Sequence, residues 1–384
     1  MEKIEKNEIV LVSPFFPPNV GGLETHLQYL TDYLSRKNIP AAVITYKPLT
    51  TRAASWERAE KKGSVSIRRI NWFGYDLFEK LARYPLLEFL YIFPGLFWGT
   101  LWYSLKNKKR ISCFHAHGLV AGAVVRAVNL FLKKRSILST HYIYGLNKRP
   151  FFSKVLVWVF EGFDRLLPVG LDSQAELVRA GLDPQKMSIF KQWINNQQLF
   201  VYKKEKIELR KKLGLPNDKK IVLFVGRLLK MKGIGFLLEA GIKNSEMMIV
   251  FIGEGEMKEK IVVSAKKFNN IIYVGKKFGA ELVDYYNASD MIALPSVKEA
   301  SSLVVVEALS CGKPVIITNR GCSKDMFDDY LGEKITPSAE NILSAVEKII
   351  QRKITDPLLE EKCRQFAVAN YSEKNAQAII ANYL

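Results

Sequence analysis

The sequence predicts an α/β protein built from two Rossmann-like domains that face each other across a cleft. Short β-branched runs alternate with helical patterns in two successive series, as is typical of parallel sheets covered by helices. An irregular charged stretch over residues 192–218 separates the two series. The 384 residues also suffice for two domains of ordinary size, each with its own core.

The first series predicts strands at 8–13, 41–46, 65–70, 113–116, 135–140 and 165–169. A helix should begin near Leu23, because Leu27, Leu30 and Leu34 lie on one stripe. The second series begins at Lys220 and contains "KIVLFVG", "MMIVFIG", "NIIYVG", "MIALPS" and "PVIIT". Each of its first four runs ends in Gly or Pro–Ser, as expected where loops gather at the carboxyl ends of parallel strands. We therefore place the domains at 1–195 and 196–365, followed by a C-terminal helix over 366–384 that crosses back to the first domain.

Composition indicates a globular protein, with 48% hydrophobic and 25% charged residues. The four cysteines have neither paired nor metal-type spacing, so we expect reduced thiols in a cytoplasmic protein. The N-terminal stretch has no apolar segment long enough for a signal peptide, because Ile9–Val12 runs into prolines. Secretion is therefore not expected.

The net charge of +19 predicts an anionic partner: nucleic acid, acidic lipid or a phosphorylated metabolite. Residues 61–110 contain ten basic and only three acidic residues, interleaved with twelve aromatics. Aromatic residues beside a basic run are typical of segments that lie on an anionic membrane surface. No zinc-finger, RNP or helix-turn-helix pattern accompanies the charge, so nucleic acid is not expected as a partner.

Residues 85–105 carry one charge in 21 positions, and three interpretations remain open for them. The segment is long enough for a transmembrane helix, although Pro94, Gly95 and Gly99 interrupt it. It could instead lie on a bilayer or form a buried helix pair. We favour these last two interpretations over a membrane span.

The loop "GRLLKMKG", Gly226 to Gly233, follows a predicted strand directly. Arg227 and Lys232 would emerge from it at the edge of the cleft. A forked guanidinium and a point-charge ammonium together suit a diphosphate. The alternative is an ordinary surface loop whose basic side chains are simply solvated.

The stretch "LPSVKEASSLVVVEALSCGKP" places Glu299 before a predicted helix and Glu307 inside it. The helix should run from about Ser302 to Cys311, with Ser301 or Ser302 as its N-cap. Its positive N-terminal end could hold a phosphate, while both acids could bind sugar or ribose hydroxyls. For Glu307, a generic solvent-facing helix position is the alternative.

Several pieces then occur together in a fixed order. "SPFFPPNVGGLETHLQYL", "FHAHG" and "STHYIYG" precede "VGRLLKMKGIGFLLEA", "FIGEGE", "ASDMIALPS" and "EASSLVVVEALSCGKPVI". In this order they resemble the retaining GT-B glycosyltransferases of family 4, and the two glutamates match that family's E-x7-E motif. The resemblance covers essentially the whole chain.

The resemblance implies an acceptor-binding first domain and a second domain that binds a nucleotide sugar. Arg227 and Lys232 would hold the donor's pyrophosphate, Glu307 its ribose and Glu299 the transferred sugar. The remaining donor-binding candidates are loop or helix-end residues: Gly21, Gly22, Ser301, Ser302 and Leu303.

Histidines and tryptophans complete the candidate site. By the same resemblance His141 would lie near the reacting sugar, with His117 as a weaker candidate on the acceptor side. For either histidine, a hydrogen-bonded residue at a strand end without a chemical role is the alternative. Trp98 and Trp102 are further acceptor-side candidates, from the aromatic basic segment.

The chain departs from the family pattern in three places. "EASS" stands where "EGFG" is common, so Ser302 replaces a glycine, and "WINN" at Trp193–Asn196 stands for the usual "NGVD". No D-x-D motif is present. We therefore expect neither a metal nor another cofactor, with cations and a helix end replacing the metal.

The expected activity is transfer of a sugar, with retention, from a nucleotide-sugar donor to an acceptor hydroxyl. A lipid-linked or glycan acceptor in cell-envelope synthesis would fit the aromatic basic segment, and would place the protein in the cytoplasm, peripheral to the membrane. A sugar-nucleotide epimerase of the same fold, a related phosphorylase, a non-catalytic scaffold and a nucleic-acid-binding protein are the alternatives.

Overall fold

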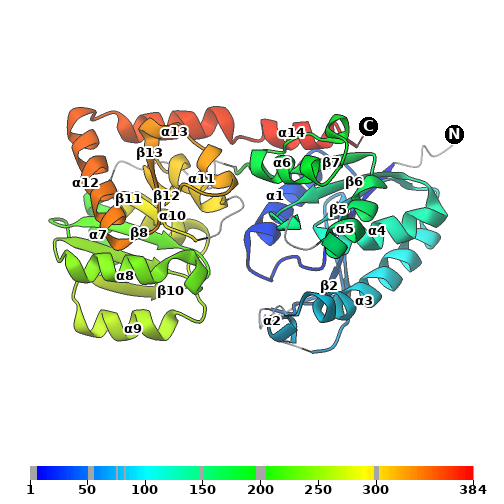
Figure 1. Cartoon of the computed structure of the whole chain (residues 1–384), viewed down its shortest axis with the longest axis horizontal. Helices are drawn as coiled ribbons and strands as arrows, with labels where there is room; N and C mark the ends of the chain where they lie inside the picture. Colours follow the sequence, from blue (N-terminus) through cyan, green and yellow to red (C-terminus); the bar gives the residue numbers. More distant parts are fainter. Residues whose placement is uncertain are drawn as a thin grey trace. The chain divides into compact units, whose positions relative to one another are not determined.

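The computed structural model describes residues 7–50, 56–74, 77–81, 84–146, 150–195, 205–297 and 302–383. The chain divides into two compact units, one of residues 1–191 with 376–384 and one of residues 192–375. Each unit is a parallel β-sheet with helices packed around it (Figure 1). The prediction of two Rossmann-like α/β domains is confirmed.

Unit 1, residues 1–191 with 376–384, contains a seven-stranded sheet in the order β3-β4-β2-β1-β5-β6-β7. Its strands are β1 (Glu8–Val12), β2 (Ala41–Tyr46), β3 (Ala59–Lys62), β4 (Val65–Ile70), β5 (Ile111–His117), β6 (Arg135–Thr140) and β7 (Arg165–Pro168). All neighbours pair in parallel except β3, which is antiparallel to β4 at the sheet edge. Strand β3 was not predicted, because "AEKK" is polar and largely exposed and lacks the pattern of a buried strand.

Among the described residues, the part of unit 1 up to residue 191 contains the helices α1 (Gly22–Arg36), α2 (Leu77–Leu81), α3 (Pro85–Lys106), α4 (Leu119–Leu132), α5 (Pro150–Glu161) and α6 (Leu171–Arg179). The predicted stripe of α1 is correct, since Leu27, Leu30 and Leu34 are all fully buried. Strands β1 and β2 are buried along their whole length, as expected for a parallel sheet covered on both faces.

Helix α3 continues through Pro94, contrary to the expected interruption. The hydroxyl of Tyr46 donates to the carbonyl of Ile92, and it accepts from the amide of Leu96 at 2.6 Å. The side chain of Tyr46 therefore bridges two main-chain groups that lie four residues apart, at the turn that contains the proline. Within the described residues, no helix combines the length and hydrophobicity needed to cross a membrane.

Unit 2, residues 192–375, contains a six-stranded, all-parallel sheet in the order β10-β9-β8-β11-β12-β13. Its strands are β8 (Lys220–Val225), β9 (Met247–Ile252), β10 (Ile271–Gly275), β11 (Met291–Leu294), β12 (Val315–Thr318) and β13 (Gly332–Ile335). Its helices are α7 (Lys206–Leu213), α8 (Ile234–Lys243), α9 (Lys258–Lys267), α10 (Gly279–Ala288), α11 (Leu303–Ser310), α12 (Ala339–Thr355) and α13 (Leu359–Asn370). The first five of these strands were predicted, whereas the short β13 was not.

The predicted single helix over 366–384 is wrong. Helix α13 ends at Asn370, and α14 covers only Lys374–Ile380. At the break, the buried hydroxyl of Tyr371 donates to the carbonyl of Met326, which anchors the turn to unit 2. Residues 376–384 pack with unit 1, so the chain does return to its first unit as predicted.

Gly233 gives a first prediction about stability. It caps α8 with a φ of 75°, and a Cβ there would lie 2.0 Å from the carbonyl oxygen of Pro295. We expect Gly233→Ala to lower the free energy of unfolding by more than about 1–2 kcal/mol, the cost of left-handed backbone alone. Urea unfolding would measure it.

Gly235→Ala is the matched control. Gly235 lies inside α8, and among the described residues no neighbouring atom lies within 4 Å of a Cβ placed there. Alanine should therefore stabilise the helix by about 0.5–1 kcal/mol. Equal effects of the two substitutions would contradict this account of Gly233.

Candidate functional site

Both sheets contain one point at which the strand order reverses. In unit 1 the order runs outward in opposite directions from β1 and β5, and in unit 2 from β8 and β11. Parallel α/β sheets bind ligands outside the carboxyl ends of the strands at such a reversal, because the flanking loops diverge there. Four sets of described candidates follow these strands: Gly21 and Gly22 after β1, His117 at the end of β5, Arg227 and Lys232 after β8, and Ser302, Leu303 and Glu307 after β11.

The loop after β8 is fixed by main-chain contacts with the loop after β9. Gly226 donates to the carbonyl of Ile252 at 3.0 Å, and Leu228 donates to that of Glu254 at 2.8 Å. A Cβ on Gly253 would lie 1.8 Å from the carbonyl oxygen of Gly226, so only glycine permits this approach. The main chain of the loop is therefore fixed by close contacts, and the Arg227 side chain is exposed at the sheet edge.

Lys232 ends the short 3-10 helix η3 (Lys230–Lys232) of the same loop and is partly buried. The amide of Lys230 donates to Oε1 of Glu256 at 3.0 Å. The amide of Val297, just after β11, donates to the carbonyl of Met231 at 2.8 Å. The cationic loop and the segment that leads toward α11 are therefore joined at one edge of the sheet.

Helix α11 begins at Leu303 with Ser302 as its N-cap, which confirms the predicted helix within one residue at each end. The Ser302 side chain makes no capping hydrogen bond, so it leaves the amides of the first turn to other partners. Ser302 and Leu303 are both buried. Glu299 and Ser301 lie outside the described residues.

Glu307 points into the protein rather than into solvent. Its side chain belongs to a residue only 7% exposed, and Oε2 accepts a hydrogen bond of 2.6 Å from the hydroxyl of Tyr286 on α10. Burial raises the pKa of Glu307 to about 7, although the bond from Tyr286 acts in the opposite direction. The solvent-facing alternative is therefore wrong, and the carboxyl is held in one orientation.

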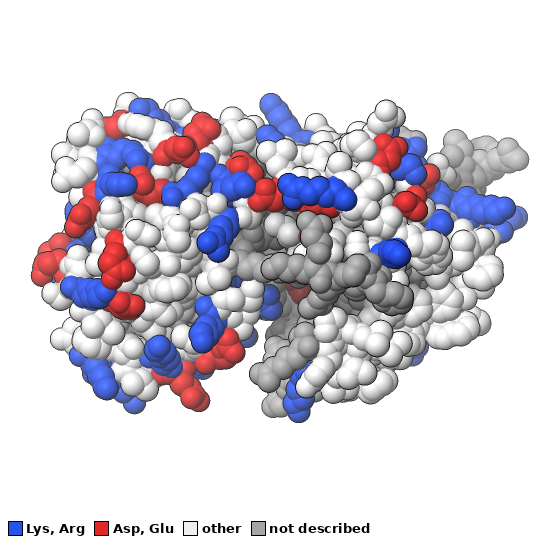
Figure 2. Space-filling model, in the orientation of Figure 1, with Lys and Arg blue, Asp and Glu red and all other residues white. Residues whose placement is uncertain are grey.

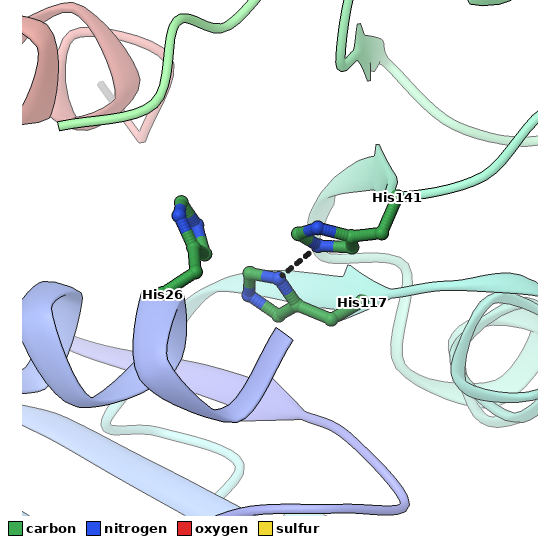
Figure 3. Close-up of side chains that lie close together, drawn as sticks. All are labelled: His26, His117 and His141. Carbon is green, nitrogen blue, oxygen red and sulfur yellow. Dashed lines mark hydrogen bonds between the residues drawn. The ribbon is translucent and has the colours of Figure 1, made fainter. Parts of the chain in front are cut away.

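Three histidines meet at the carboxyl edge of the sheet in unit 1 (Figure 3). His26 comes from α1, His117 ends β5, and His141 follows β6. One ring nitrogen from each lies within 4.8 Å of the other two. Nδ1 of His117 and Nε2 of His141 are 3.2 Å apart, at hydrogen-bond distance. The ring of Phe190 packs against His26 and His141.

Two imidazoles of the cluster resist protonation. Burial holds the pKa of His117 and that of His141 well below the usual value. Next to His117, the fourth histidine, His115, is engaged on both nitrogens, by the hydroxyl of Tyr383 at 2.8 Å and that of Ser139 at 2.8 Å. The three imidazoles of the cluster are of a residue type that binds transition metals in proteins.

The structure does not bring Trp98 and Trp102 to His117. Both tryptophans lie on α3, which packs against β2, β4 and α4, whereas His117 ends β5. The two indoles are 63% and 76% exposed, whereas His117 is 1% exposed. The exposed indoles and the buried imidazole of His117 therefore do not form one surface.

The tryptophans instead belong to a surface that we call the aromatic face. Its exposed members are Trp98 and Trp102 on α3, Leu130 and Phe131 on α4, and Trp158 on α5. These helices pack side by side, α3 against α4 and α4 against α5. On the visible side of unit 1, few charged side chains lie over α3 and α4 (Figure 2). The aromatic face is thus an apolar surface shared by three packed helices.

Sequence reasoning missed Tyr286 and His26. Tyr286 lies in an unremarkable amphipathic helix, and its link to Glu307, 21 residues later, depends on tertiary packing. His26 had a local signal, since it lies four residues after Gly22 beside the buried leucine stripe of α1.

Two protein-family models match this chain. A family model described as "Glycosyltransferase Family 4" matches residues 20–198, and one described as "Glycosyl transferases group 1" matches residues 205–371. The chain belongs to this glycosyltransferase family. The two models divide near the boundary between the two units, and the predicted resemblance is confirmed.

The similarity to individual proteins is lower in identity or covers less of the chain. A Bacillus subtilis glycosyltransferase named for teichuronic acid biosynthesis, TuaC, is 34% identical over 46% of this chain, and the match spans only 45% of its own length. Two solved structures share the fold over nearly the whole chain. Sucrose-phosphate synthase from Thermosynechococcus elongatus has a TM-score of 0.80 at 20% identity and covers 98% of both chains. HepE from Anabaena, solved with UDP-glucose, has a TM-score of 0.77 at 16% identity and covers 97% of this chain and 98% of its own.

The buried Glu307 gives a prediction about pH. The folded carboxyl keeps its proton up to a pKa of about 7, whereas the usual value is 4.5. The folded state therefore binds more protons between pH 4.5 and 7, and the free energy of unfolding should fall as pH rises through this window. Glu307→Gln removes this loss, so it should gain up to about 3 kcal/mol at pH 8 and little at pH 4.

Urea unfolding across pH 4–8 would measure the effect. Tyr286→Phe is the informative companion, because loss of the hydroxyl removes a bond that favours the carboxylate. That variant should be less stable than the wild type, most of all at pH 8. A stability difference between Glu307→Gln and wild type that does not change with pH would contradict the prediction.

Proposed function

We propose that this protein is a retaining glycosyltransferase that moves a sugar from a nucleotide-sugar donor to an acceptor hydroxyl in cell-envelope glycan synthesis. One observation carries the proposal. A rigid cationic loop and the start of α11, with its buried acid, occupy the reversal point of one parallel sheet. The complex of HepE with UDP-glucose supports a nucleotide sugar as the donor.

The roles follow from charge and position. Arg227 and Lys232 bind the pyrophosphate, to which the amides at the start of α11 also donate. Glu307 accepts from the ribose hydroxyls, and Glu299 binds the transferred sugar. Ser301, Ser302 and Leu303 line the donor, and Gly21 and Gly22 let the main chain approach its phosphates. For Gly22 this is supported by the open space, because no described atom lies within 4 Å of a Cβ there.

The chemistry requires stabilisation of the negative charge that develops on the departing diphosphate. Two fixed cations and a helix end provide this without reorganisation, so the proposed reaction needs no metal or other cofactor. The leaving phosphate takes the proton of the attacking acceptor hydroxyl while that oxygen bonds to the anomeric carbon on the same face. This route preserves the configuration and needs no protein nucleophile. His141 lies beside the reacting sugar.

The double variant Arg227→Ala/Lys232→Ala tests the donor site. We expect turnover to fall at least about 10²- to 10³-fold, the cost of one lost preorganised donor, together with weaker nucleotide affinity. A radiolabelled nucleotide-sugar panel, with affinity from calorimetry, would measure both. Lys230→Ala is the control, since it removes the same charge from an exposed position of the same loop. Unchanged transfer and affinity in the double variant would overturn the proposal.

An assay without acceptor separates the nearest alternative. An epimerase of this fold would convert its nucleotide sugar alone, whereas a transferase needs an acceptor for net transfer. Conversion of the donor sugar to its epimer, without acceptor, would replace the proposed function.

For the acceptor we propose a lipid-linked or membrane-presented glycan, reached by peripheral attachment to the cytoplasmic face of an anionic membrane. The aromatic face supports this, because tryptophans are stable at the boundary between headgroups and acyl chains. Exposed cations follow it directly in sequence: Lys106, Lys108, Lys109 and Arg110. Each basic residue near an anionic surface contributes about 1 kcal/mol.

Co-sedimentation with vesicles that contain anionic lipid tests the attachment. Trp98→Ser/Trp102→Ser should weaken binding at least about tenfold, since burial of each large apolar side chain contributes about 1.5–3 kcal/mol. Trp56→Ser is the control, because Trp56 is an exposed tryptophan outside the aromatic face. If wild-type protein does not bind at low salt, or if the control loses as much, the membrane proposal is wrong.

A further inference from the structure

A pocket of about 550 Å³ lies in unit 1 between two helix-to-strand turns, the one from α4 to β6 and the one from α5 to β7. Three basic residues, Lys133, Lys134 and Arg135, line it together with one acid, Asp164. The pocket lies at the amino end of β6, whereas His141 follows the carboxyl end of that strand. It is therefore separate from the residues proposed for sugar transfer.

The turn after α4 holds Lys133 in an unfavourable conformation. Lys133 caps the helix with a φ of 50°, in the left-handed region where glycine is the usual residue. The side chain of Asn129 fixes the turn, because Nδ2 donates to the carbonyl of Lys134 at 2.6 Å and Oδ1 accepts from its amide at 2.7 Å. A lysine in this conformation costs stability that a glycine would not, and such strain is concentrated at functional sites.

Arg126 on α4 adds a fourth cation beside the pocket. Its guanidinium lies against Gly162, where a Cβ would be 2.2 Å from Cζ, so the glycine makes room for it. Nη1 is 3.5 Å from the carbonyl oxygen of Gly162, and Cζ lies 5.6 Å from the centroid of the Trp158 ring. Nε is buried with no hydrogen-bond partner among the described residues. A guanidinium in this position favours an anion nearby.

The acid of the pocket does not cancel these cations. Oδ2 of Asp164 accepts from the amide of Ser136 at 2.8 Å and from its hydroxyl at 3.2 Å, so this oxygen is engaged at the start of β6. In the part of the chain that the structure describes, neither Lys133 nor Lys134 forms an ion pair. The pocket therefore has an excess of positive charge, which suits an anionic ligand.

The pocket lies next to the aromatic face. Leu130 and Phe131, 56% and 65% exposed, directly precede the basic turn, and Trp158 lies one helical turn before Gly162. A phospholipid has the same arrangement, with a charged headgroup joined to apolar chains. A free anion would need only the cations, whereas the adjoining apolar side chains favour a lipid.

We propose that this pocket binds the phosphodiester headgroup of one anionic phospholipid, with Lys133, Lys134 and Arg135 donating to its phosphate oxygens. The acyl chains then begin along Leu130 and Phe131. This inference rests on the proposed attachment to an anionic membrane, and it gives that attachment a site for a single lipid. Cations that served only to complement the negative carboxyl end of α4 would need neither a pocket nor a strained lysine.

Dihexanoyl phosphatidylglycerol, used below its critical micelle concentration, is the probe, because it presents one headgroup without a membrane. Calorimetry with the full chain should show saturable binding of a single equivalent. Inorganic phosphate lacks the apolar part, and dihexanoyl phosphatidylcholine lacks the net charge, so each should bind at least about tenfold more weakly. Phosphate that binds as tightly as the probe, or a probe that does not saturate, would overturn the proposal.

Lys133→Gly assigns the site without impairing folding. Glycine suits the left-handed turn, so the urea midpoint should stay the same or rise. Affinity for the probe should nevertheless fall at least about tenfold, as expected for one lost hydrogen bond to a charged group. Lys109→Ser is the matched control, because it removes an exposed cation that does not line the pocket. Equal affinity of Lys133→Gly and wild type would exclude this pocket.

The soluble probe also separates this site from the attachment on which it rests. Wild-type protein that co-sediments with anionic vesicles but does not bind the probe would reject the pocket alone. Probe binding that Lys133→Gly weakens, in a protein that does not co-sediment, would support the pocket and reject the attachment.

Discussion

The reversal of strand order in each sheet is the constraint on which the arrangement of this protein depends. Parallel strands connected by right-handed crossovers place successive helices on one face, and the face changes only where the order reverses. In unit 2 this point lies between β8 and β11, and in unit 1 between β1 and β5. The segments that follow these strands contain the candidate functional residues. They are a cationic loop, a helix N-terminus and a loop with two glycines.

Polar groups at both reversal points are held in place at the expense of stability. Glu307 is buried with a single side-chain partner shown, Tyr286, and its pKa is raised toward neutrality. In unit 1, His26 and His117 are buried beside the partly buried His141, and burial lowers the pKa of His117 and that of His141. Such groups destabilise a fold unless a ligand satisfies them, and strain of this kind is concentrated at functional sites. The same argument supports the donor proposal.

Local sequence patterns predicted most of the fold. Strands such as β2 and β8, and helix α11, have the predicted bounds or differ by one residue, because buried parallel strands and glycine-terminated helices carry strong local signals. The failures share a cause in tertiary contacts. Pro94 does not break α3 because Tyr46, 48 residues earlier, bridges the adjoining turn. The edge strand β3 exists because β4 pairs with it.

The candidate site was predicted less completely than the fold. Motif spacing placed Arg227, Lys232 and Glu307 at the right strand ends, since those positions depend on local order along the chain. Tyr286 and His26 reach the candidate residues through contacts between different elements, which spacing along the sequence does not predict. Composition also did not show that Trp98 is exposed on α3 whereas His117 is buried at the end of β5.

The bond from Tyr383 to His115 has a consequence for biosynthesis. A protein chain emerges from the ribosome in order, and its domains generally fold as they appear. Unit 1 cannot do so completely, because the phenol that supports His115, next to His117, is synthesised only after all of residues 192–375. The contact between Tyr383 and His115 therefore forms only after residues 192–375 have been synthesised.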